Sequence, residues 1–493
     1  MPGGRGGGEL AAENAALRVE NAELRRVNAE LIKRVEELER RLGADSSNSS
    51  RPPSTDAPWA KKPAKKRSSR GRSGRKPGKQ PGAASCTREL VDDPDETVVI
   101  EPPECGRCAA PLAGAPEHDR QRRQVVDLPP PPTPHVTEYQ RVSKTCPGCG
   151  AITAPGWDAV GDDDDNALVL AGPGSPVRIG PAALARCTLL ACAHYLPIGR
   201  ARDLVETLCG IDVSTGFVAG VRARAARRLE NRFLPHLREL LADAPVLHAD
   251  ETPARAAGSL AYVHVACTEY LTLCHTGDRS AATIDAGGVL PAFTGVLVRD
   301  GYAGYQHLAC AHAWCAAHLL RDLRSVSDPD PDGQLWALAM ATCLLDANTA
   351  AVRAREAGRD RLTPALLTRI RSAYHGSLAR GSDDNRDQDG PLPDRARTLI
   401  GRFRRYEDMI LRFATDLTVP LTNNEAERSC RPVKIQQRTS GGAWRTLQGL
   451  TDFAVVHSYL DTATKWGQDK LVVLHQLFTN DGAWVPPALV PAS

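Results

Sequence analysis

The chain has 493 residues, enough for several domains of ordinary size with a large buried core. Hydrophobic residues make up 42% and charged residues 25%, and the net charge of +3 gives no overall argument for a nucleic-acid partner. No run of 18 apolar residues occurs, and the N-terminal MPGGRGGGEL lacks the apolar core of a signal peptide. We therefore expect a cytoplasmic protein without a membrane span, whose 14 cysteines are free, buried or metal-bound.

A heptad repeat of leucines predicts a coiled coil over residues 9–43. The leucines at position d are Leu10, Leu17, Leu24, Leu31 and Leu38. Three of the a positions then hold Asn14, Asn21 and Asn28, and buried asparagines at a favour a parallel dimer in one register. Matched charges would meet across the dimer in the pairs Glu13–Arg18, Glu20–Arg25 and Arg34–Glu39. The alternative is a solitary amphipathic helix, which would not need such pairs, so we expect a homodimer or higher oligomer.

Residues 44–85 are rich in Ser, Pro, Gly, Lys and Arg and hold too few apolar residues to fold alone. Ten basic residues and no acidic one lie between Lys61 and Lys79. A flexible arm of this kind can neutralise DNA phosphates, although a solvated linker has the same composition. The expected DNA contacts are Lys61, Lys62, Lys65, Lys66, Arg67, Arg75 and Lys76. The arm follows the zipper and is broken by Pro and Gly, which excludes a basic-zipper transcription factor.

Two Cys-x2-Cys pairs in residues 86–160 predict a structural zinc site. The pairs are Cys105 with Cys108 and Cys146 with Cys149. Four thiolates can hold zinc tetrahedrally, and the intervening RQVVDLPPPPTPHVTEYQRVSK is predicted to form two strands around a proline-rich connection. We therefore expect a small zinc ribbon with little core of its own, the alternative being four unrelated free cysteines.

Residues 170–240 are helical in pattern. One helix is expected to end at Gly210, and a second is expected to open at Ser214. The short turn between them is typical of a helix-turn-helix DNA-binding motif. Four arginines add positive charge to the second helix: Arg222, Arg224, Arg227 and Arg228. Ordinary helix packing explains the same pattern, so both interpretations stay open.

Apolar runs in residues 245–324 predict a mixed sheet. PVLHADETP is a strand with Asp250 at its end, and FTGVLVRDGYAGY is a later strand with Asp300 at its end. Between them, LAYVHVACTEYLTLCHT is predicted to form two strands around Thr268–Glu269, followed by a helix near 279–290. This order suggests that the first and fourth strands lie side by side, with both aspartates at one end. Such a carboxylate pair can bridge two divalent ions, and Mg²⁺ suits an all-oxygen site. Taken singly, each aspartate has the simpler interpretation of a turn or helix cap.

With these residues, the chain resembles the insertion-sequence-66 family of transposases over nearly its whole length. The similar segments are DSSNSSRPPSTD, RKPGKQPG, CGRC…CPGC, LHADET, RDGYAGY, CAAHLLRDL and NNEAERSCRP. The resemblance implies a ribonuclease-H-like DDE domain whose acids Asp250, Asp300 and Glu427 hold two Mg²⁺ or Mn²⁺ ions. It also matches Cys315 and His318 to a Cys-x2-His element of the family. We assign that pair a structural or site-supporting role rather than metal ligation, because no other zinc ligand is obvious nearby.

The gap of 127 residues between the second and third acids (427 − 300) exceeds what a ribonuclease-H core needs. Residues 325–416 are therefore expected to form a helical insertion, with helical patterns in LWALAMATCLLDANTAAVRA and RARTLIGRFRRYEDMILRFA. Residues 417–480 then hold the helix of the third acid and the C-terminal helices. The family resemblance implies that this is the kind of helical insertion that other DDE enzymes carry before the third acid.

The third-acid helix begins in the stretch LTNNEAERSCRPVK. Thr422 and Glu425 have the spacing of a capping box, and Glu427 lies about 200° around the helix from Glu425. Pro432 is expected to end or bend this helix. Four basic residues are expected to line the DNA path, unless they form a solvated helix face: Arg428, Arg431, Lys434 and Arg438.

The sequence thus predicts a multidomain α+β protein. Its expected parts are an N-terminal coiled coil, a small zinc ribbon, a helical DNA-binding region and, from the resemblance, a ribonuclease-H-like α/β catalytic domain with a helical insertion. The expected function is a nucleoid-associated DDE transposase that binds terminal inverted repeats and catalyses Mg²⁺-dependent cleavage and strand transfer into target DNA. Two alternatives remain: a nuclease of the same fold without strand transfer, and a non-catalytic zipper and zinc DNA-binding regulator.

Overall fold

The computed structural model describes Arg26 and residues 89–493, apart from 129–132, 161–163, 172–175, 480–481 and 491–493. Apart from Arg26, the predicted coiled coil (9–43) and basic arm (44–85) lie outside the described residues. The chain divides into a small unit, residues 61–133, and a larger unit that includes everything from Pro134 onward. Each unit is described by itself.

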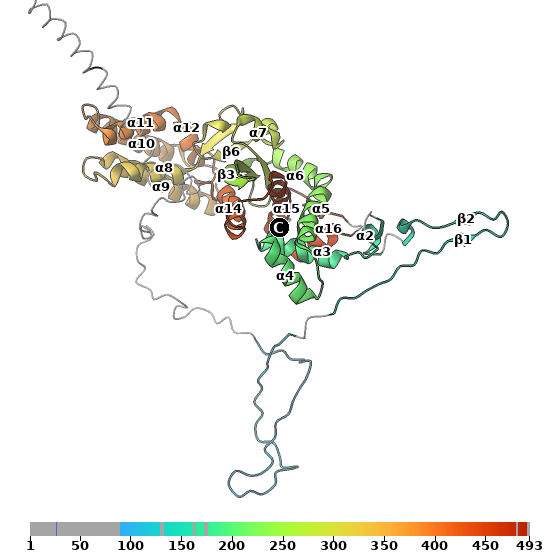
Figure 1. The fold of residues 1–493 in the computed structure, drawn as a ribbon. Helices are drawn as coiled ribbons and strands as arrows, with labels where there is room; N and C mark the ends of the chain where they lie inside the picture. The colour runs from blue at the N-terminus through green and yellow to red at the C-terminus, as the bar shows by residue number, and fades with distance from the viewer. Residues whose placement is uncertain are drawn as a thin grey trace, which may run out of the picture. The chain divides into compact units, whose positions relative to one another are not determined.

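A five-stranded mixed sheet lies at the centre of the larger unit (Figure 1). Its strands are β3 (Val246–Ala256), β4 (Ser259–Cys267), β5 (Thr272–Gly277), β6 (Val296–Arg299) and β7 (Ala311–Trp314). Their spatial order is β5-β4-β3-β6-β7. The pairs β3–β4 and β4–β5 are antiparallel, whereas β3–β6 and β6–β7 are parallel. The prediction that the first and fourth strands of this region lie side by side is therefore confirmed.

The register between β3 and β6 sets two aspartates level with each other. The last parallel pair is His248 with Val298, and Asp250 and Asp300 each lie two residues further on. The prediction that Asp250 ends its strand is wrong, since β3 continues to Ala256 along β4. The antiparallel partner β4 satisfies the backbone of β3 beyond the point where β6 stops. Asp250 thus lies where the parallel pairing ends and Asp300 just past the end of β6.

Helices before and after the sheet pack with it into one hydrophobic core. Those before it are α3 (Pro181–Thr188), the π-helical turn η3 (Leu189–Ala193), α4 (Ile198–Cys209), α5 (Thr215–Glu230) and α6 (Phe233–Ala242). Those after it are α14 (Asn424–Thr439), α15 (Leu447–Lys465) and α16 (Lys470–Leu477). α15 contacts both β5 and α5, and α14 contacts β3 and β4. The helical region 170–240 therefore shares its core with the sheet.

The predicted turn between α4 and α5 is confirmed. Gly210 ends α4 in the left-handed conformation (φ +65°), which glycine adopts at little cost. Ser214 caps α5 by accepting a hydrogen bond from the backbone N–H of Phe217 (3.0 Å). Two arginines of α5 make contacts within the fold: Arg222 lies 5.5 Å from the ring of Trp444, and Arg228 donates to the carbonyl of Leu477 (3.0 Å). These two contacts agree with the packing interpretation of α5.

The predicted helical insertion forms a second hydrophobic core. It follows α8 (Ala316–Ser327) and consists of α9 (Leu335–Glu356), α10 (Pro364–Asp384), α11 (Pro391–Arg405), α12 (Glu407–Ile410) and α13 (Arg412–Thr415). Within the described residues, α9 alone is long and apolar enough to span a membrane. Because Trp336 and other apolar residues of α9 are buried in this core, the helix is explained by packing.

Smaller elements connect these parts. They are β1 (Lys144–Thr145), β2 (Ile152–Thr153), η2 (Trp157–Val160), α2 (Ala167–Ala171), α7 (Ala281–Ala286), η4 (Leu290–Ala292) and η5 (Ala303–Tyr305). The prediction of two strands around the proline-rich connection is wrong for the described residues, because 121–128 and 133–143 contain no strand. Apolar side chains there stay exposed, 92% for Val125 and 85% for Val136, so no buried face supports a sheet.

Two glycines of α10 allow a matched test of packing in the insertion. A Cβ on Gly381 would lie 2.6 Å from ring carbons of Trp336, whereas one on the exposed Gly376 would meet nothing within 4 Å. We expect Gly381→Ala to lower the free energy of unfolding by about 1–3 kcal/mol through overpacking. We expect Gly376→Ala to raise it by up to about 1 kcal/mol through helix propensity. Urea unfolding measures both, and a Gly381→Ala protein as stable as Gly376→Ala would contradict the packing.

Candidate active site

Three predicted acids lie on separate elements around the parallel part of the sheet. Asp250 comes from β3, Asp300 follows β6, and Glu427 comes from the first turn of α14. Burial raises the pKa of Asp250 well above its usual value, and the charges of Glu251, Asp300 and Glu427 raise it further. Asp300 and Glu427 are thus both within electrostatic reach of Asp250.

The environment of this acid cluster fits a divalent cation. Asp250 and Asp300 each accept one backbone hydrogen bond, from Glu251 (2.9 Å) and Tyr302 (2.8 Å). Apart from its backbone hydrogen bond, the largest influences on Asp250 are burial and neighbouring carboxylates. Buried carboxylates without a cation repel one another, and a bound divalent ion would relieve that repulsion. The all-oxygen donors suit Mg²⁺ or Mn²⁺.

Glu251, which we did not predict, has its own cationic partner. Its side chain is only 2% exposed and forms an ion pair with Arg279 (2.5 Å). Tyr305 donates its hydroxyl to the second carboxylate oxygen (2.8 Å). Burial and Asp300 raise the pKa of Glu251, while Arg279 and Tyr305 oppose that rise. A glutamate inside a buried strand was the sequence signal for such a partner, since an unpaired buried charge is costly.

Asn423 fixes the start of α14 against β3. The residue is 1% exposed, and its side-chain amide donates to the carbonyl of Ala249 (2.7 Å). Its side-chain oxygen bonds Nδ1 of His248 (2.9 Å), and its backbone N–H donates to Sγ of Cys315 (3.2 Å). Glu427 donates its backbone N–H to the carbonyl of Asn423 (3.2 Å), so these bonds also place the third acid.

The predicted capping box of Thr422 and Glu425 is wrong. Asn423 occupies the N-cap of α14 and makes no side-chain cap hydrogen bond. Its amide is already bonded to β3, and the carboxylate of Glu425 accepts from Arg428 instead (2.9 Å). α14 also continues past Pro432 to Thr439, so the helix does not end at that proline, and a bend there stays a prediction.

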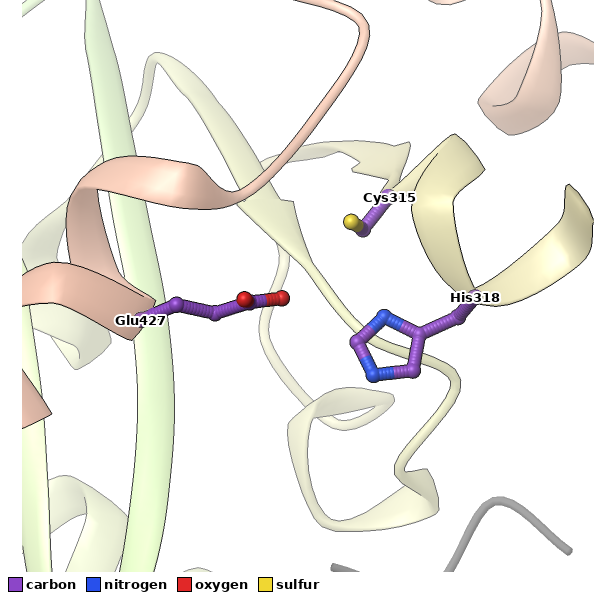
Figure 2. A group of neighbouring side chains, drawn as sticks. All are labelled: Cys315, His318 and Glu427. Atoms are coloured by element: carbon purple, nitrogen blue, oxygen red, sulfur yellow. The ribbon is translucent and has the colours of Figure 1, made fainter. Parts of the chain in front are cut away.

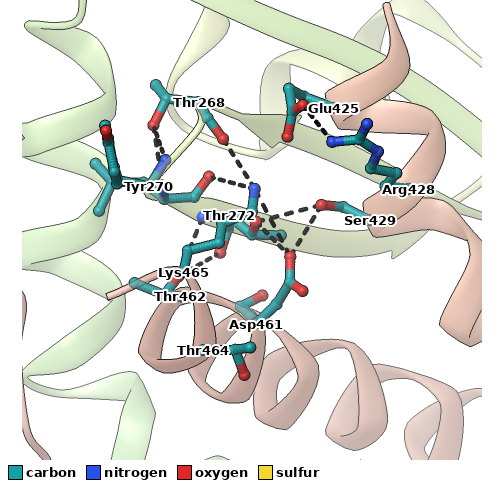
Figure 3. A network of polar contacts seen from close by, with 12 residues as sticks. Thr268, Tyr270, Thr272, Glu425, Arg428, Ser429, Asp461, Thr462, Thr464 and Lys465 are labelled. Atoms are coloured by element: carbon teal, nitrogen blue, oxygen red, sulfur yellow. Dashed lines mark hydrogen bonds and ion pairs between the residues drawn. The ribbon is translucent and has the colours of Figure 1, made fainter. Parts of the chain in front are cut away.

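A second network holds the middle of α14 to β5 and α15 (Figure 3). Asp461 accepts hydrogen bonds from the hydroxyls of Thr272 (2.7 Å) and Ser429 (2.9 Å) and lies 3.8 Å from Nζ of Lys465. Burial opposes ionisation of Asp461, but His457, Lys465 and the two hydroxyls together hold its pKa below the usual value. Asp461 is therefore a half-buried acid whose charge has partners, unlike Asp250.

Cys315 and His318 lie beside the third acid. The Cys315 sulfur, a ring nitrogen of His318 and a carboxylate oxygen of Glu427 all lie within 4.8 Å of one another (Figure 2). The expectation that no further ligand lies near the Cys-x2-His pair is therefore wrong. Sequence distance concealed it, since Glu427 follows His318 by 109 residues (427 − 318).

The predicted basic residues of α14 differ in their surroundings. Arg428, Arg431 and Arg438 are exposed, and Arg428 pairs with Glu425. Lys434 is half-buried and donates to the carbonyl of Pro253, and burial together with Arg438 lowers its pKa to about 8. Lys434 therefore turns toward β3. The predicted contacts of the basic arm, from Lys61 to Lys76, lie outside the described residues.

The two Cys-x2-Cys pairs have the same local structure. In each, the first cysteine donates its backbone N–H to the carbonyl five residues on, Cys105 to Ala110 and Cys146 to Ala151, both 2.8 Å. Backbone N–H groups within each turn also lower the pKa of Cys105 and Cys146, as suits thiolate ligands. The pairs belong to different units, so the four-cysteine site stays a prediction. All 13 cysteines in the described part of the chain are free.

Comparison with known proteins gives two family matches. Residues 176–451 match the model of the Transposase IS66 family, and residues 6–89 match a family of unknown function (DUF6444). No curated protein matches the chain. The first match covers 276 of the 493 residues (451 − 176 + 1) and includes the sheet, the insertion and all three acids. The chain belongs to the IS66 family of transposases, which makes it an enzyme that acts on DNA.

Proposed function

We propose that this transposase cleaves DNA at the ends of its element and joins the freed 3′-hydroxyl to target DNA. The observation that supports the proposal is that the charges of Asp300 and Glu427 both act on the carboxylate of Asp250 at the end of the parallel β3–β6 pairing. The strand order β5-β4-β3-β6-β7, with acids on β3, just after the adjacent β6 and on a later helix, supports a ribonuclease-H-like catalytic domain. Membership of a transposase family supports the substrate, DNA.

In this proposal the three acids hold two Mg²⁺ or Mn²⁺ ions. When bound, such ions activate an attacking oxygen and stabilise the leaving oxygen of a phosphodiester. The chain's own part is to fix the carboxylates: the β3–β6 register sets the two aspartates level, and Asn423 brings the third acid to them. The same arrangement can serve water in cleavage and a 3′-hydroxyl in strand transfer, so no nucleophilic side chain is required.

The remaining predicted parts give the proposed DNA complex. Exposed Arg428, Arg431 and Arg438 continue along α14 from the third acid and are suited to contact phosphates. The zipper (9–43) would join two chains, and the basic arm (44–85) would add contacts to terminal repeats or target DNA. The four cysteines would hold one structural zinc ion, which their matched knuckle turns support.

The acid cluster predicts the effect of removing each carboxylate. We expect Asp250→Ala, Asp300→Ala and Glu427→Ala to lower Mg²⁺-dependent cleavage of terminal DNA by about 1000-fold or more, as loss of several kcal/mol implies. Gel-shift binding to the same DNA should change little. Glu425→Ala is the matched control on α14 and should cleave normally. Full cleavage by Glu427→Ala would remove that residue from the proposed site.

Strand transfer separates this proposal from a nuclease of the same fold. With a pre-cleaved end that bears a 3′-hydroxyl, Mg²⁺ and a supercoiled plasmid, we expect covalent joining of the end to the plasmid. An end blocked by a 3′-dideoxynucleotide should give no joined product. Cleavage without joining would favour the nuclease, and neither activity would favour the non-catalytic regulator.

Charge repulsion at Asp250 predicts an unusual effect on stability. In EDTA, Asp250→Asn should raise the thermal midpoint, by about 2–4 °C for each kcal/mol of repulsion relieved. Asp461→Asn is the matched control and should lower the midpoint, because Asp461 has Lys465 and two hydroxyls as partners. Added Mg²⁺ should raise the midpoint of the wild type and not that of Asp250→Asn. A destabilised Asp250→Asn protein would argue for a structural aspartate instead.

A further inference from the structure

The fold places a third potential metal ligand, Glu427, next to the Cys-x2-His pair at the start of α8. Cys315, His318 and Glu427 present one thiol, one imidazole and one carboxylate within 4.8 Å of one another. Figure 2 shows the three side chains directed toward a common point between α8 and α14. Cys315 is fully buried and the other two are half-buried, so the common point is only partly shielded from solvent.

The spacing is near that of a zinc site. Zinc takes thiolate sulfur at about 2.3 Å and nitrogen or oxygen at about 2.0–2.1 Å, so tetrahedral ligand atoms lie about 3.3–3.6 Å apart. Contraction from the present spacing needs shifts on the order of 1 Å, which small side-chain rotations supply. The mixture of a soft thiolate with an imidazole favours zinc over Mg²⁺ at this point.

His318 provides an independent observation. Its Nδ1 atom is buried and has no hydrogen-bond partner among the described residues. In Figure 2, Nδ1 is the ring nitrogen bonded to the carbon that joins the ring to the backbone side, and it is turned toward Cys315 and Glu427. A buried polar atom without a partner costs roughly 1–3 kcal/mol, and a metal ion would satisfy it.

The surroundings of the Cys315 sulfur provide a second observation that supports a metal site. It accepts the backbone N–H of Asn423 (3.2 Å), and the N–H groups of Ala317 and His318 lie close to it. Those two groups are two and three residues after the cysteine. N–H groups at the same two offsets face the sulfur of Cys105 and of Cys146 in the Cys-x2-Cys turns. The three turns thus share one arrangement of backbone donors around the sulfur, although burial, the largest influence, raises the pKa of Cys315 above its usual value.

We propose that Cys315, His318 and Glu427 bind one zinc ion, separate from the four-cysteine zinc and from the Mg²⁺ ions. Three protein ligands leave a fourth position for water or a phosphate oxygen. A carboxylate has two oxygens, so Glu427 can face the zinc with one and Asp250 with the other. Zinc would then act as a positioning element for the third acid. Zinc binding does not require DNA cleavage, so its test and the test of the proposed function fail independently.

The test is the zinc content of the purified full-length protein, measured by mass spectrometry after dialysis. We expect His318→Ala and Cys315→Ser each to lower it by one zinc ion per chain. His375→Ala is the matched control, since His375 is an exposed histidine that also bonds a carboxylate, Glu407 (2.8 Å). It should leave the zinc content unchanged. Wild-type zinc content in both His318→Ala and Cys315→Ser would overturn the proposal.

Substitution of Cys315 or His318 can lower zinc content by unfolding the protein. A second variant therefore leaves both residues in place. Cys105, Cys108, Cys146 and Cys149 are replaced together by serine, which leaves α8 and α14 intact. This protein should retain one zinc ion per chain and, with Co²⁺ in place of zinc, show the charge-transfer band of a thiolate ligand. Loss of both the zinc and the band, in a protein with wild-type circular dichroism, would overturn the proposal.

Discussion

The arrangement of the three acids depends on one buried amide. Asn423 bonds His248 and Ala249 across 175 and 174 residues of chain, and its backbone N–H reaches the Cys315 sulfur. Ala249 immediately precedes Asp250, and Glu427 lies one helical turn after Asn423. A single side chain therefore sets the spacing between the first and third acids. The Asp461 network then holds the rest of α14 to β5 and α15, which keeps the helix from rotating about that contact.

The fold treats its buried acids in two different ways. Glu251 has Arg279 and Tyr305 as partners, and Asp461 has Lys465 with two hydroxyls. The largest charges that act on Asp250 are those of other carboxylates, and burial also disfavours its ionisation. Natural proteins break the rule of paired buried charge mainly at functional sites. The contrast among three acids in one core supports a cation site at Asp250.

Local patterns were enough to predict much of this fold. The adjacency of the first and fourth strands followed from alternating apolar runs, and Gly210 and Ser214 correctly marked the end of α4 and the start of α5. Long-range contacts were not predictable in that way. The capping box failed because Asn423 is held by β3, a competitor 175 residues away that no local rule includes. The neighbours of Glu251 and His318 were missed for the same reason, since each partner arrives from a distant segment.

The insertion shows why such contacts are needed. It leaves the sheet through α8 and returns at α14, and its helices share a second hydrophobic core with Val298 of β6 and with Ala313 and Trp314 of β7. The two ends are joined at a neck, where Ala316 donates its backbone N–H to the carbonyl of Leu421 (2.9 Å) and Asn423 contacts Cys315. Closing a loop costs entropy that grows only slowly with length, so a closed neck allows a long insertion without displacing α14 from the sheet. Cys315, His318 and Glu427 lie at this neck, and a metal ion bound there would join its two sides directly beside the acid cluster.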